Sequence, residues 1–213
     1  MKIRFFNLML VIMCASASLC RAYPKPAIVP QQTEWTLEVV FDQPRQISVK
    51  IPNHARKERF WYIILTLTNN SGSDVGFYPS CDLFTDTFQV VPAGIRTQQQ
   101  VFKQIKLKHQ GKYPFLESID FVESNFLQGP DNAKDVVIIW RDFDAKAKNV
   151  DLFIAGLSNE TVVVDHPTQT DERSEPLKVY LRKTLDLKYA IGGDPTLRHS
   201  AKLVFKEKTW VMR

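Results

Sequence analysis

The chain has 213 residues, with 28 Lys and Arg against 23 Asp and Glu, and a formal net charge of +5. Residues 1–22 hold three basic side chains and no acid, so residues 23–213 carry 25 basic against 23 acidic groups, a net charge of +2. A nearly neutral remainder argues against a nucleic-acid partner, which requires a strongly basic surface.

Residues 1–22 have the features of an export signal. Lys2 and Arg4 precede an apolar stretch, Phe5–Met13, and small residues lie one and three positions before Tyr23. The apolar stretch is shorter than the roughly 20 residues that span a bilayer, and no later segment is long and apolar enough to do so. We predict cleavage after Ala22 and an exported protein, periplasmic or extracellular, with an uncleaved N-terminal anchor as the alternative.

Residues 23–34 contain three prolines and no periodic pattern, which predicts a linker between the signal and one β-domain over residues 35–213. Two of the three cysteines lie in the signal, so Cys81 remains without a partner for an internal disulfide. No histidine is near it in the sequence, and we expect a small buried apolar residue rather than a nucleophile.

Residues 59–68 are predicted to form the central strand of this domain. Alternating apolar residues predict two earlier strands over 35–41 and 47–51. In 59–68, by contrast, both alternation sets are apolar, which is typical of a strand covered on both sides. One set is Trp61, Ile63, Leu65 and Leu67, and the other is Phe60, Tyr62 and Ile64.

The middle of the chain mixes strand and helix patterns. Residues 75–91 predict strands with a hairpin turn near Asp86-Thr87, and Pro79 indicates an edge, bend or crossover. Residues 97–128 predict a helical insertion packed on the β-core. It holds one helix of about ten residues that includes Val101 and Ile105, and a second short helical piece between Pro114 and Glu123.

Strand patterns resume after residue 135, over 136–140, 150–155, 161–164 and 201–210. The most regular one covers 177–191, where apolar residues alternate with polar ones and only Lys183 interrupts the apolar face. This pattern predicts a half-buried antiparallel strand with a bend or bulge near Lys183. About nine short strands and one small insertion predict an antiparallel, immunoglobulin-like β-sandwich.

Few residues suggest a functional site. Asp142, Asp144 and Asp151 are the candidates for a binding site because their spacing resembles a calcium loop, but the glycine and terminal glutamate of an EF-hand are missing, which favours a solvated turn. The four histidines have no second ligand at a metal spacing, so no metal site is predicted and each is expected in a loop or on the surface. Three of the four tryptophans lie in apolar strands, which favours core packing over a sugar-stacking platform.

Several segments resemble a group of exported bacterial proteins of unknown function. They are Phe60–Val75 with Phe77, Pro79 and Leu83–Asp86, then Leu127–Asp135 with Trp140, Ala155–Ser158 and Leu181–Leu185. The resemblance covers most of the chain after the signal. It implies an exported protein with a sandwich fold and supplies no catalytic residue.

No catalytic or cofactor motif is found, so we predict a protein that is not an enzyme and needs no cofactor. The leading hypothesis is an exported interaction or structural module of the cell envelope, whose partner is another envelope protein or a glycan. The alternative is a ligand-binding module for carbohydrate or calcium, and the third is a hydrolase. An exposed apolar patch favours the first, clustered outward Trp or Tyr the second, and a pocket with histidine near carboxylates the third.

Overall fold

The computed structural model describes residues 34–213, except for 53–54, 95–98, 171, 173 and 194. The predicted signal, residues 1–22, lies outside the described residues, as does the predicted linker apart from Glu34. Residues 34–213 form one unit that contains two larger β-sheets and a two-stranded one.

The first sheet is built around the predicted central strand. Its order is β1-β3-β9-β7. β1 and β2 follow each other along the same edge of β3, where β1 pairs with the C-terminal part of β3 and β2 with its N-terminal half. The strands are β1 (Glu38–Phe41), β2 (Arg45–Lys50), β3 (Lys57–Thr68), β7 (Glu117–Ser118) and β9 (Lys134–Arg141). The prediction for residues 59–68 is therefore confirmed, with β9, formed by the apolar run 136–140, as the other neighbour of β3.

Both faces of β3 are buried, as its two apolar sets predicted. Trp61, Ile63, Leu65 and Leu67 face the core between the two larger sheets. On the opposite face, Phe60, Tyr62 and Ile64 form a second apolar cluster with Val101 and Ile105 of helix α2 (Gln99–His109). The helix covers this outer face because its apolar residues recur at helical spacing.

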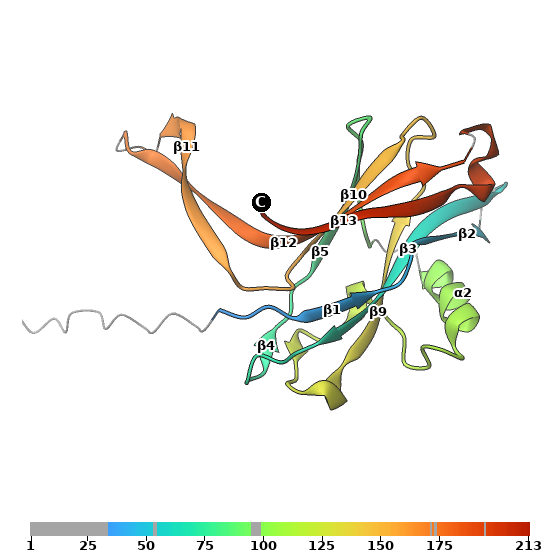
Figure 1. Ribbon diagram of the computed structural model, residues 1–213, viewed down its shortest axis with the longest axis horizontal. Coiled ribbons are helices and arrows are strands. Elements are labelled where there is room, and N and C mark those ends of the chain that lie inside the picture. Colours follow the sequence, from blue (N-terminus) through green and yellow to red (C-terminus); the bar gives the residue numbers. More distant parts are fainter. Residues whose placement is uncertain (1–33, 53–54, 95–98, 171, 173, 194) are drawn as a thin grey trace, which may run out of the picture. The chain divides into compact units, whose positions relative to one another are not determined.

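The second sheet has the order β11-β12-β10-β5-β6, with β13 paired to the other edge of β12 (Figure 1). Its strands are β5 (Ser80–Thr85), β6 (Val90–Pro92), β10 (Asn149–Ala155), β11 (Thr161–Thr170), β12 (Pro176–Gly192) and β13 (Lys202–Met212). β5 and β6 form the predicted hairpin, with Asp86 and Thr87 in the turn.

The two larger sheets contribute to one continuous core, so the fold is mainly β, consistent with a sandwich. Trp61 and Trp140 are each 1% exposed, and Trp35 and Trp210 pack against the same core. The preference for tryptophans in the core is confirmed. Cys81 is a buried free cysteine of this core, also as predicted.

The insertion over 97–128 contains both predicted helical pieces together with an unpredicted strand. Helix α2 is present, and the short piece predicted between Pro114 and Glu123 is the 3₁₀ helix η3 (Ile119–Phe121), which directly follows strand β7. β7 pairs in parallel with β9, an exception to the antiparallel prediction. The remaining short elements are β4 (Val75–Gly76), which pairs with β8 (Asn125–Phe126), and the 3₁₀ segments η4 (Pro130–Asn132) and η5 (Pro195–Ser200).

The expectation that every histidine lies in a loop or on the surface is wrong for His109. Its ring is buried at the end of α2, with Nε2 3.0 Å from the hydroxyl of Tyr62. Burial lowers the pKa of His109. Its Nε2 atom, together with Val101 and Ile105, ties α2 to the sheet. His54 lies outside the described residues.

β12 is a single 17-residue strand, and Lys183 divides it into two parts. From Thr184 to Leu187 it is buried. Residues 176–182 are mostly exposed and pair with β11, and Arg182 also exchanges backbone hydrogen bonds with Arg213. Lys183 donates to Glu160 and to Thr36 Oγ1, and its ammonium lies 5.3 Å from the Trp210 ring centroid. The charged residue therefore marks the end of the covered core. The register irregularity with β13 lies at Lys188/Tyr189, five residues beyond the position predicted for a bend or bulge.

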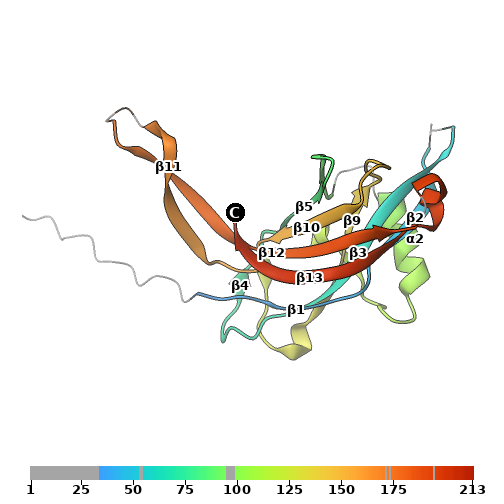
Figure 2. The same cartoon turned by 45° about the horizontal axis from the view of Figure 1, so that its top comes forward.

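The hairpin of β11 with residues 176–182 of β12 is called the arm. Figures 1 and 2 show it reaching away from the other strands of the second sheet. The apolar alternation continues through the arm without a facing sheet, which is why sequence periodicity predicted a half-buried strand there.

Candidate functional site

A groove of about 760 Å³ lies between the bend that joins β1 to β2 and the beginning of β13. Among the described residues, β2 is an edge strand of the first sheet and β13 is an edge strand of the second. The groove therefore runs between two sheet edges that do not pair with each other. The lining residues are Gln43, Pro44, Arg45, Gln46 and Trp61 on one side, and residues 199–205 on the other.

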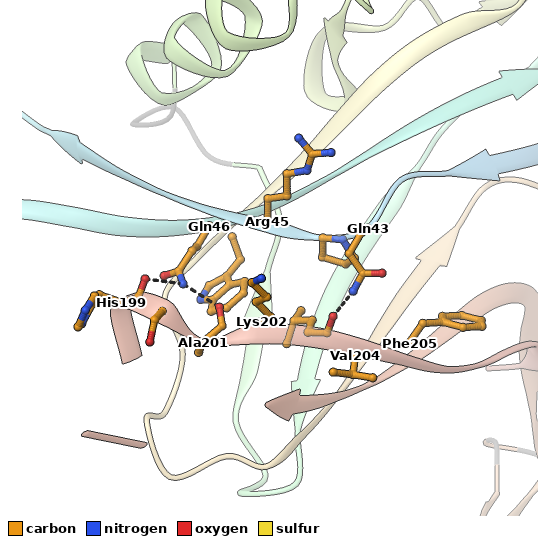
Figure 3. A pocket seen from close by; sticks show the side chains of 12 residues that line it. Gln43, Arg45, Gln46, His199, Ala201, Lys202, Val204 and Phe205 are labelled. Carbon is orange, nitrogen blue, oxygen red and sulfur yellow. Dashed lines mark hydrogen bonds between the residues drawn. The ribbon is translucent and has the colours of Figure 1, made fainter. Parts of the chain in front are cut away.

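Two glutamine side chains bridge the two edges of the groove. Gln46 Nε2 donates to the carbonyl oxygens of Ala201, at 2.8 Å, and His199, at 2.9 Å, and Gln43 Nε2 donates to that of Leu203 (Figure 3). These bonds satisfy carbonyl groups that would otherwise be available to another strand. They hold the two edges together at one end of the core.

The groove places a lysine over an apolar lining. Lys202 and His199 line it, and none of its described lining residues is acidic. Arg45 also belongs to the lining, but its side chain points away from β13 (Figure 3) and its guanidinium lies 4.0 Å from the Asp42 carboxylate. Val204 and Phe205, 50% and 42% exposed, supply apolar surface together with Pro44, whereas Trp61 and Leu203 line the groove but are almost fully buried. Such a lining fits an anionic ligand with apolar parts.

Asp142 is the centre of a charged cluster beside Trp61. Its carboxylate accepts a hydrogen bond of 2.8 Å from Trp61 Nε1 and lies 3.1 Å from an Arg59 nitrogen and 3.8 Å from one of Arg198. Arg198 is buried and stacks on Phe143, 4.4 Å from the ring centroid. Burial lowers the pKa of Arg198, and the Asp142 charge opposes that effect.

The three candidate aspartates do not come together as a calcium site. Asp142 is engaged by the two arginines, and Asp144 accepts a bond of 2.9 Å from the Lys146 backbone in a turn. Asp151 lies on β10, in the second sheet. Across the part of the chain that the structure describes, no three His, Cys, Asp or Glu side chains are placed to hold a metal ion.

Asp151 belongs to a different cluster, on the outer face of the second sheet. Asp151 lies opposite Lys188 in the register of β10 and β12. Asp186 precedes Lys188 by two residues on β12, so its side chain is on the same face of the sheet. Asp186 is 3% exposed, and its Oδ1 atom has no hydrogen-bond partner among the described residues. Burial, then repulsion from Asp151, raises the pKa of Asp186 to about 6. Sequence periodicity assigned Asp186 to a polar face but gave no sign of its burial.

A second hollow, of about 490 Å³, includes Cys81 and Asp120 in its lining. Burial raises the pKa of the Cys81 thiol, and the Asp120 charge adds to that effect. The thiol is therefore protonated at neutral pH, which makes it a poor nucleophile.

The arm exposes apolar side chains on both of its faces. Val162 faces Leu181 and Val164 faces Val179 on one side, while Val163 faces Tyr180 on the other. The exposed fractions are 42% for Val162, 50% for Val163 and 67% for Tyr180. The alternation of apolar residues predicted these strands but not their exposure, because alternation alone does not reveal whether a second sheet covers a face.

Comparison with protein-family models, curated proteins and solved structures finds no match. Among the described residues, no helix combines the length and the apolar character needed to cross a bilayer.

Proposed function

We propose that this protein is an exported, non-enzymatic interaction module of the cell envelope that binds another protein through the arm. The observation that carries the proposal is the exposure of apolar residues on a two-stranded hairpin. An isolated hairpin of this kind is marginally stable in water without a partner surface. Exposed apolar surface that is contiguous marks interaction sites in soluble proteins.

The arm differs from the other exposed apolar residues of the domain. Tyr78, Phe88, Phe115 and Phe121 are exposed at separate turns and loops, and single exposed residues of this kind are common. The arm instead gathers five large apolar side chains, each at least 38% exposed, on two paired strands: Val162, Val163, Val164, Leu177 and Tyr180. This concentration favours a protein partner.

Export and fold family are parts of the same proposal. The pattern in residues 1–22 supports export, because a basic start, an apolar stretch and small residues before Tyr23 occur together. The two packed, largely antiparallel sheets support an immunoglobulin-like sandwich. Domains of that architecture commonly act through their surfaces, which agrees with a role in binding.

We expect site-specific photo-crosslinking to capture a partner from the arm. Tyr180 is replaced by p-benzoylphenylalanine in the organism that makes the protein, and Phe88, which is 95% exposed on the β5–β6 turn, is replaced in the same way as a control. Irradiation should give a discrete adduct only from position 180, detected on denaturing gels and sequenced by mass spectrometry. No adduct at 180, or the same adducts from both positions, would contradict the proposal.

The groove supports a second candidate function, the binding of an acidic peptide. Its edges are extended strands, so an extended chain fits along it, and the charge of Lys202 favours carboxylates. This candidate keeps the predicted alternative of a ligand-binding module but changes the ligand class from carbohydrate or calcium to acidic peptide. The described lining has a lysine and no acid, and its tryptophan, Trp61, is 1% exposed.

Replacing Lys202 by alanine should weaken the binding of a fluorescent Glu-Phe-Glu-Phe-Glu peptide about two- to fivefold in low salt, since an exposed charge contributes roughly 0.5–1 kcal/mol. Fluorescence anisotropy is the measurement. The matched control replaces Lys103, an exposed lysine of α2, by alanine. Undetectable binding to the wild type, or equal weakening by the control, would reject the groove as the site.

A further inference from the structure

The outer edge of β11 carries backbone groups that point away from β12. The Lys183 N–H donates to the Glu160 carbonyl, at 2.9 Å, which fixes the phase of the ladder between β11 and β12. Because bonded and non-bonded pairs alternate in an antiparallel ladder, the N–H and C=O groups of Thr161, Val163 and Asp165 face outward. On the β12 side, the mutual bonds between Arg182 and Arg213 agree with this phase.

This edge has no partner strand within the described part of the chain, where β11 pairs only with β12. Pro167 lacks an N–H group and ends the stretch that can pair. Residues 161–165 therefore remain as an open edge of five residues. The first four, Thr161 to Val164, are β-branched and favour a strand, and only Asp165 does not.

We propose that the partner of the arm is a second copy of this chain, joined by antiparallel pairing of the two β11 edges about a two-fold axis at Val163. The inference rests on the proposed function, because it names the partner of the same surface. In this register Val163 pairs with its own copy, and Thr161 pairs with Asp165 of the other copy. All three outward-facing residues then exchange both of their backbone hydrogen bonds.

Side chains are also complementary in this register. Val162 lies opposite Val164 of the other copy, which extends the apolar face formed with Leu181 and Val179 across the axis. Asp165 faces the Thr161 hydroxyl rather than a second carboxylate, so no like charges oppose each other. Within each copy Asp165 already has an ion pair with Lys178, which neutralises its charge near the interface.

The other edge of the arm is less suited to self-pairing. On β12 the outward groups of Arg182 already bind Arg213, and Pro176 has no N–H. Only Lys178 and Tyr180 keep both groups available there. On the β11 edge, three residues each have both a free N–H and a free C=O group, and the central one, Val163, can lie on the two-fold axis. We therefore assign this edge to the second copy.

Engineered cysteines test the register directly. In the Val163→Cys protein the two new thiols would lie on strand positions about 5.5 Å apart between Cα atoms, within the roughly 4.4–6.8 Å range of disulfides. In the Val162→Cys protein each new thiol would lie opposite Val164 of the other copy. The two thiols would then be two residues apart along the strands, too far apart to form a disulfide. Mild oxidation of the full-length exported protein should give a disulfide-linked dimer from Val163→Cys only. The wild type, whose Cys81 is buried, serves as a second control.

Backbone substitution tests the pairing without a cross-link. Val163→Pro removes an outward N–H that makes no bond within the arm, and Val163→Thr keeps it with similar strand propensity. Native mass spectrometry over a dilution series should show dimers for wild type and Val163→Thr and at least a tenfold loss of dimer for Val163→Pro. Val163→Lys, which places two ammonium groups at the axis, should also be monomeric and does not alter the backbone.

Three outcomes would overturn the inference: a wild type that stays monomeric at all concentrations, a Val163→Pro protein that dimerises as well as wild type, or equal disulfide formation from both cysteine variants. A photo-crosslinked adduct at position 180 that contains a different protein would reject the second copy yet leave the arm as an interaction surface. The absence of any adduct together with a monomeric wild type would reject both proposals.

Discussion

The Asp142→Ala protein is expected to be about 3 kcal/mol less stable than wild type. Removing this carboxylate leaves Arg59 and the buried Arg198 without their shared counter-charge, and leaves Trp61 Nε1 without its acceptor. Breaking a fully buried ion pair costs roughly 3–5 kcal/mol, and we take the lower end because the Asp142 side chain is 32% exposed.

Urea unfolding at pH 7 measures this effect, with two variants for comparison. Asp142→Asn keeps an oxygen for Trp61 but removes the charge, so it should lose an intermediate amount, about 1–2 kcal/mol. Asp131→Ala, at an exposed position of η4, should change stability by no more than about 0.5 kcal/mol. If Asp142→Ala unfolds at the same urea concentration as Asp131→Ala, the cluster does not stabilise the fold.

The second large effect is a pH dependence caused by Asp186. Its pKa is raised from 3.8 to about 6 in the folded protein, so between these values the folded state binds more protons than the unfolded state. Stability from this group is therefore greatest below pH 4 and decreases as pH rises to about 6. At 1.36 kcal/mol per pKa unit the loss is at most roughly 3 kcal/mol.

Asp186→Asn removes this ionisation, so the variant should gain stability relative to wild type as pH rises from 4 to 7, by on the order of 2 kcal/mol. The measurement is urea unfolding at several pH values. Asp131→Asn is the matched control and should show no such trend. A difference between Asp186→Asn and wild type that is constant across this pH range would mean that Asp186 ionises normally in the folded protein.

The parts of the fold that were predictable are those with a local pattern. The two apolar sets of residues 59–68 predicted a strand buried on both faces, and the spacing of Val101 and Ile105 predicted α2. Between Pro114 and Glu123 the predicted short helical piece is present as η3, but strand β7 was not predicted because a two-residue strand is too short to show a period. His109 was misplaced because its partner, Tyr62, is 47 residues away.

The candidate sites were less predictable because they are assembled across the fold. Asp142 was noticed for its acidic neighbours, whereas its contacts are Arg59, Trp61 and Arg198, from β3 and η5. The exposure of the arm depends on where the facing sheet stops. Lys183 was the local sign of that boundary, since a charged residue in an otherwise apolar face indicates contact with solvent.

The bridging of β1 and β2 to β13 has a consequence for how the chain folds. Gln43 and Gln46 near the start of the domain bind carbonyls of residues 199–203 near its end, and Lys208 reaches the Val39 carbonyl at 3.4 Å. The first-made strands therefore cannot complete the core until the last have been synthesised. Contacts between residues so distant in sequence have a high loop-closure cost, which places this domain among slowly folding, non-local β-proteins. A chain that stays unfolded until residues 199–208 have been synthesised would be compatible with the export proposed above, because a narrow channel admits only unfolded chains.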